Sequence, residues 1–72
     1  MKSDTRERLL VVMRELEKPV CMNDIISAVE NETGTRPNRK SIYSDLRTIE
    51  KFYPMKVERV RSVTWYSLDV NV

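Results

Sequence analysis

One glycine and three prolines divide this 72-residue chain into short segments. Pro19, Pro37 and Pro54 each interrupt helical structure, because proline lacks the backbone N–H and its ring restricts the residue before it. Gly34, the single glycine, follows a stretch with helical periodicity and can adopt the left-handed conformation that ends many helices. These four residues divide the chain into three segments that can each form a helix and one C-terminal segment. A chain of this length supports one small domain.

Apolar residues recur at helical spacing in the first three segments. We expect helices over about residues 4–17, 22–33 and 38–52, with a brief extended stretch at Pro19-Val20-Cys21. Asn38 is the expected N-cap of the third helix, because its side chain can accept a hydrogen bond from the first turn. The core-facing stripes are Leu9, Val12, Met13 and Leu16; Ile25, Ile26 and Val29; and Ile42, Leu46 and Ile49.

The segment after Pro54 predicts a β-hairpin over about residues 55–69. Met55-Lys56-Val57 and Thr64-Trp65-Tyr66-Ser67-Leu68 are rich in β-branched and aromatic residues, which are typical of strands. Their connection holds neither Asn-Gly nor Asp-Gly, so the register of the hairpin stays open. The predicted fold is α+β over residues 1–72, a winged helix-turn-helix in which a three-helix bundle carries a C-terminal β-hairpin wing.

The aromatic pair Trp65-Tyr66 has two interpretations. Neighbouring aromatic residues can form a stacking platform for single-stranded nucleic acid. Alternation along a strand instead places Tyr66 and Leu68 on one face, where Tyr66 would close the core and Trp65 would be partly exposed. We favour the second interpretation.

The residues that most enzymes and metal sites need are missing from the sequence. The chain has no histidine and one cysteine, and it lacks a glycine-rich phosphate loop. Catalysis by Ser-His-Asp or Cys-His groups is therefore ruled out, as is an internal disulfide. For Cys21 we expect a small buried side chain, with a redox thiol as the alternative. The sequence predicts no enzyme activity, no metal and no cofactor.

Nothing in the sequence indicates a membrane protein. The longest apolar run, residues 9–13, is far shorter than the roughly 18 residues of a membrane span. The charged N-terminus is not followed by the apolar stretch of a signal peptide. We expect a cytoplasmic protein without a membrane partner, and we infer no small-molecule ligand.

Charge is distributed unevenly along the chain. Residues 1–35 hold five basic and seven acidic side chains, whereas residues 36–61 hold eight basic and three acidic ones. The net charge thus changes from −2 to +5 between these stretches, although the whole chain carries only +2. A concentrated basic region is typical of a nucleic-acid contact, with a solvated surface as the alternative.

The third predicted helix carries the basic residues that we expect to contact DNA. An advance of about 100° per residue places a polar row opposite its apolar stripe, consisting of Lys40, Ser44, Arg47 and Lys51. Tyr43 and Thr48 flank this row, and Asp45 and Glu50 lie at its sides. Arginine and lysine can donate to guanine, and the helix N-terminus attracts phosphate. The expected base-reading residues are Lys40, Ser44 and Arg47, the expected phosphate contacts are Arg36, Asn38, Arg39, Tyr43 and Lys51, and the wing residues are Arg59 and Arg61.

These residues resemble a known family. The segment Asn38-Arg39-Lys40-Ser41-Ile42-Tyr43-Ser44-Asp45-Leu46-Arg47-Thr48-Ile49-Glu50 is similar to the recognition helix of DeoR-type and WYL-domain transcriptional regulators. Tyr66-Ser67-Leu68 resembles the closing Tyr-x-Leu of their wing, and Pro19-Val20 their short strand. The resemblance covers about residues 5–68 and implies a sequence-specific, double-stranded DNA-binding regulator.

Two positions depart from that family. Ser44 stands where its members usually have arginine, and Phe52-Tyr53-Pro54 replaces a glycine after the recognition helix. The effector domain of the larger regulators has no counterpart in this sequence. A winged-helix protein-interaction module, such as an adaptor or an inhibitor of a nucleic-acid enzyme, is therefore the alternative function. For DNA binding, a homodimer on a symmetric site is the expected assembly.

Overall fold

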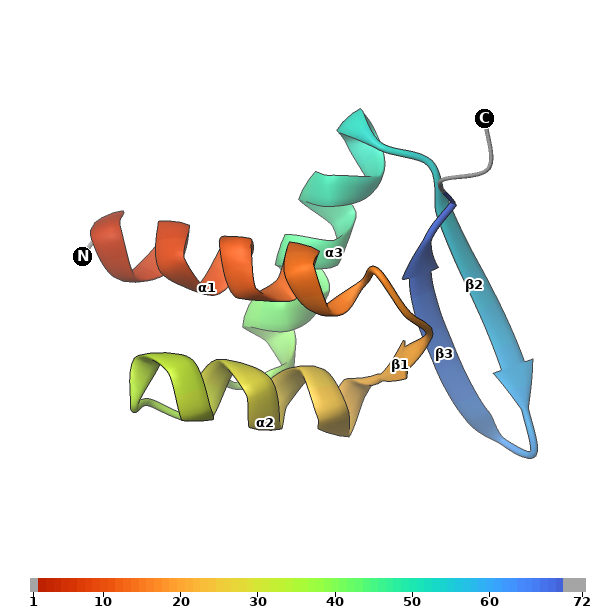
Figure 1. Cartoon of the computed structure of the whole chain (residues 1–72), viewed down its shortest axis with the longest axis horizontal. Coiled ribbons are helices and arrows are strands. Elements are labelled where there is room, and N and C mark those ends of the chain that lie inside the picture. The colour runs from red at the N-terminus through yellow and green to blue at the C-terminus, as the bar shows by residue number, and fades with distance from the viewer. Residues whose placement is uncertain (1, 70–72) are drawn as a thin grey trace.

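The computed structural model describes the backbone of residues 2–69 and the side chains of residues 6–69. This part of the chain is an α+β domain of three helices and a three-stranded antiparallel sheet (Figure 1). No described helix is both long and apolar enough to cross a membrane. Along the chain the elements are α1 (Lys2–Glu15), β1 (Val20–Cys21), α2 (Met22–Thr33), α3 (Arg39–Phe52), β2 (Met55–Val60) and β3 (Val63–Leu68).

The predicted α+β class and order of elements are confirmed, and one helix differs in its bounds. We expected the first helix over about 4–17, but α1 begins at Lys2 and ends at Glu15. After Glu15 the backbone tightens, since Glu17 N–H donates to the carbonyl of Arg14 at 3.3 Å, three residues back. Such i→i−3 bonds commonly form the last turn before a helix stops.

The core lies where the three helices meet. All three predicted stripes contribute to it, but Leu9 and Met13 are only partly buried at its margin. Val11, which lies outside the predicted stripe, is 8% exposed. Because α1 packs against both α2 and α3, its buried surface is wider than one stripe. The buried residues are Val11, Val12, Leu16, Met22, Ile25, Ile26, Val29, Ile42, Leu46 and Ile49.

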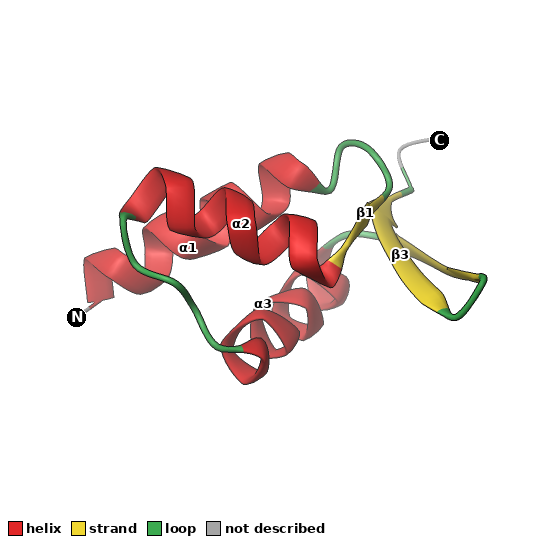
Figure 2. Cartoon of the chain, turned by 90° about the horizontal axis from the view of Figure 1, so that it is seen from below, coloured by secondary structure: helices red, strands yellow, loops and turns green. Residues whose placement is uncertain are grey.

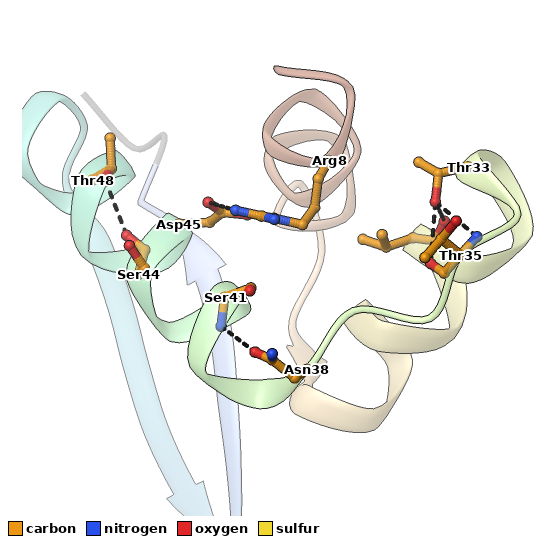
Figure 3. A network of polar contacts seen from close by, with 9 residues as sticks. Arg8, Thr33, Thr35, Asn38, Ser41, Ser44, Asp45 and Thr48 are labelled. Carbon is orange, nitrogen blue, oxygen red and sulfur yellow. Dashed lines mark hydrogen bonds and ion pairs between the residues drawn. The ribbon is translucent and has the colours of Figure 1, made fainter. Parts of the chain in front are cut away.

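Gly34 and Asn38 end one helix and begin the next. Gly34 has φ +79°, and its N–H donates to the carbonyl of Glu30 at 2.8 Å. The Asn38 side chain accepts a hydrogen bond of 2.9 Å from Ser41 N–H, in the first turn of α3 (Figure 3). Both predicted roles are confirmed, and these two residues set the short connection between α2 and α3.

The strand order is β1-β3-β2, with both pairs antiparallel. The hairpin turns at Arg61 and Ser62, which both have positive φ (52° and 67°), as in a two-residue type I′ turn. Asparagine and glycine usually occupy such a turn, which explains why the sequence did not reveal it. Tyr66 and Leu68 pack against the helical core and Trp65 is partly buried, as predicted. Cys21, for which we expected a buried side chain, is only partly buried, and its thiol is free.

Candidate nucleic-acid interface

The exposed side of α3 forms one open hollow. Its lining consists of Lys40, Tyr43, Ser44 and Arg47, and all four residues are exposed. The structure thus brings together the three predicted base-reading residues and one predicted phosphate contact. Lys51 is exposed one helical turn beyond Arg47, outside the lining of this hollow. We call the four residues that line the hollow, Lys40, Tyr43, Ser44 and Arg47, the outer row of α3.

We expected Asp45 at the side of the polar row of α3, but its side chain points into the protein. It is 5% exposed, and Arg8 of α1 binds both of its carboxylate oxygens (Figure 3). The Arg8 Nε–Oδ2 distance is 2.6 Å and the Nη2–Oδ1 distance is 3.0 Å, a bidentate ion pair. Hydrogen bonding to Asp45, together with the negative charge of its carboxylate, raises the pKa of Arg8. The pair joins α1 to α3 and removes one negative charge from the surface of α3.

The sequence contained a signal for this burial. Asp45 lies three residues after Ile42 and four before Ile49, which is the spacing of the apolar stripe. A carboxylate in such a stripe needs a buried cation or several donors. Arg8, 37 residues earlier in the chain, could not be identified from local spacing.

Three predicted phosphate contacts at the start of α3 already have partners within the protein. Arg36 forms an exposed ion pair with Glu30 at 3.1 Å, and the Arg39 guanidinium lies 3.5 Å from the side-chain oxygen of Asn23. The Asn38 side-chain oxygen is occupied by the helix cap. All three residues are exposed, and the first turn of α3 contains no acidic residue. The positive end of the helix is therefore accessible to an anion.

A groove separates the outer row from the hairpin. Tyr43 and Arg47 of α3 line it together with Glu50, Val57 and Tyr66. Burial, and secondarily the neighbouring hydroxyl of Tyr43, raises the pKa of Tyr66. Tyr43 therefore connects the exposed face of α3 with the side of the sheet that packs on the core.

The hairpin places its two arginines differently. Arg59 pairs with Thr64, two residues from the Val57–Tyr66 pair, so it lies on the face of the sheet that the helices cover. Arg61 lies in the turn itself, and both arginines are exposed. Figure 2 shows the sheet at the end of α2 that follows β1. Ser62 of the hairpin turn lines a second hollow with Arg39 and Tyr43 of α3, so the wing lies beside α3 and next to Tyr43 of the outer row.

Comparison with known proteins identifies no relative of this chain: no protein-family model, curated protein or solved structure matches it. The resemblance to DeoR-type and WYL-domain regulators therefore stays a prediction from the residues.

Proposed function

We propose that this chain is a winged helix-turn-helix domain that binds double-stranded DNA sequence-specifically, with α3 in the major groove. The observation that carries the proposal is the outer row, in which two cations, a hydroxyl and a phenol share one open surface. The major groove offers the O6 and N7 acceptors of guanine to arginine and lysine. In this assignment Lys40, Ser44 and Arg47 contact bases, and Tyr43 contacts the backbone.

The surroundings of the outer row support contact with a polyanion. Asp45 is neutralised by Arg8 inside the protein, and the lining of the hollow contains no acidic residue among those described. Phosphate contacts would come from both ends of α3 and from the wing, which would reach the backbone or a minor groove. The residues assigned to these contacts are Arg36, Asn38, Arg39, Lys51, Arg59 and Arg61. A small, non-enzymatic transcriptional regulator fits this arrangement.

Binding of a random-sequence duplex at increasing salt tests the electrostatic part of the proposal. With up to five phosphate contacts from arginine and lysine on each chain, the logarithm of the affinity should fall with log salt at a slope no steeper than about −4.5 per bound chain. Selection of bound duplexes from a random pool then tests sequence preference. Failure to bind any duplex at low salt would refute the proposal and favour the protein-interaction module.

A pair of lysine variants shows whether α3 makes the contact. Lys40→Ala and Lys18→Ala each remove one exposed positive charge, but Lys18 lies between α1 and β1. Binding to the selected duplex should weaken markedly in Lys40→Ala and change little in Lys18→Ala. Equal effects would show that only overall charge matters and would refute the α3 assignment.

A further inference from the structure

β2 is an exposed edge strand. It pairs with β3 on one side, and no strand within residues 2–69 pairs with its other side (Figure 1). Five of its six residues are exposed, among them Val57 at 55%. An open edge of this kind is available for pairing with another strand.

The hydrogen bonds at the end of the sheet show which backbone groups face the open edge. Asp69 N–H donates to the Pro54 carbonyl at 2.9 Å, whereas Leu68 N–H turns away from β2 and donates to Leu16 at 2.8 Å. Antiparallel ladders alternate between hydrogen-bonded and non-hydrogen-bonded pairs. Residues 56, 58 and 60 therefore bond to β3. The N–H and C=O groups that point to the open edge are those of Met55, Val57 and Arg59.

We propose that β2 pairs antiparallel with β2 of a second copy about a twofold axis at Val57. In this register Val57 pairs with Val57 of the partner subunit, and Met55 pairs with Arg59 of the partner subunit. All three residues with outward backbone groups then pair on each chain. The register also sets Lys56 opposite Glu58 of the partner subunit, and twofold symmetry produces this opposite-charge pair twice.

The neighbouring registers oppose like charges. A shift of two residues one way sets Lys56 against Lys56 of the partner subunit, and the opposite shift sets Glu58 against Glu58 of the partner subunit. Each shift also leaves one of the three outward residues unpaired. Like charges directly opposite each other destabilise a sheet, so the charges on β2 select one register.

The dimer would be a continuous six-stranded sheet with its helices on one side. The twofold axis of such a pair is perpendicular to the sheet, and the core of each copy packs on the face that carries Tyr66 and Leu68. Both α3 helices would therefore lie on the same side. Arg61 lies beyond the paired residues, in the hairpin turn. This inference does not depend on DNA binding.

Sedimentation equilibrium of the full chain without DNA tests the dimer, together with charge variants that circular dichroism shows to be folded. Lys56→Glu and Glu58→Lys should each raise the dimer dissociation constant about tenfold or more, because each creates two like-charge pairs. The double variant K56E/E58K restores both opposite-charge pairs and should restore the dimer. An equimolar mixture of the two single variants should form heterodimers.

Val57→Pro provides a second, backbone-based test. It removes the N–H that faces the open edge and leaves the bonds to β3 in place, a position where edge strands tolerate proline. A folded Val57→Pro variant should be monomeric. Three results would overturn the proposal: a wild-type monomer at millimolar concentration, a dimer indifferent to the single charge changes, or a dimer that survives Val57→Pro. DNA binding is measured separately with α3 variants, so either proposal can fail alone.

Discussion

Both faces of α3 carry polar side chains, but the inner face buries its charge in an ion pair whereas the outer face exposes its polar groups. On the inner face Asp45 is 5% exposed, and its two carboxylate oxygens accept hydrogen bonds from Nε and Nη2 of Arg8. On the outer face Lys40, Ser44 and Arg47 are exposed around one hollow. A buried charge with a dedicated partner contributes to the fold, whereas exposed donors around a hollow that no acidic residue lines are available to a ligand. Substitutions on the two faces should therefore separate stability from binding.

The largest expected effect is on the inner face. Arg8→Ala leaves the buried Asp45 carboxylate without its cation, which should lower the free energy of unfolding by about 2–4 kcal/mol. The estimate lies below that for a fully buried pair, because 22% of the Arg8 side chain is exposed. Chemical denaturation followed by circular dichroism measures the change.

Two variants control this experiment. Arg6→Ala removes an exposed arginine from the same helix and should change stability by no more than about 0.5 kcal/mol. The double variant R8M/D45L removes both charges at once and should recover most of the lost stability, since apolar pairs often replace buried ion pairs. If Arg8→Ala were as stable as Arg6→Ala, the ion pair would contribute nothing to the fold.

The matching change on the outer face should affect binding alone. Arg47→Ala should lose about 1–3 kcal/mol of binding to the selected duplex if Arg47 reads a base. Its stability should stay within about 0.5 kcal/mol of the wild type, because the side chain is exposed. Fluorescence anisotropy and denaturation on the same preparations measure both quantities. Unchanged binding in both Arg47→Ala and Lys40→Ala would exclude the outer row from the DNA contact.

Asn38 caps α3 and is also a proposed phosphate contact, so substitutions of this residue can separate stability from DNA binding. Asn38→Ala removes the cap of α3 and should cost about 1 kcal/mol of stability. Asn38→Asp keeps a capping oxygen and adds a negative charge at the helix N-terminus, so the fold should be as stable as the wild type. The same charge should weaken binding if a phosphate approaches this end of α3. Equal DNA affinity for wild type and Asn38→Asp would place the phosphates elsewhere.

The contrast between the two faces also explains what the sequence could predict. Helical spacing identified most of the apolar core and three of the four outer-row residues, and local chemistry identified Gly34 and Asn38 as helix ends. Arg8 and Asp45 are 37 residues apart, so their pairing depends on how α1 packs against α3. The register of the predicted hairpin stayed open for a different reason, since Arg61 and Ser62 adopt left-handed conformations that their residue types do not favour.

The smallest expected effect concerns Tyr66, which lies between the core and Tyr43 of the outer row. Its pKa is raised above the ordinary value of 10.0, chiefly by burial, so folding favours the neutral phenol. The stabilising contribution is complete below about pH 10 and is lost as pH rises toward the higher native pKa. Tyr66→Phe should therefore lose less stability than the wild type between pH 9 and pH 11 in denaturation experiments. Parallel pH profiles for the two proteins would show that Tyr66 ionises as easily in the folded state as in the unfolded chain.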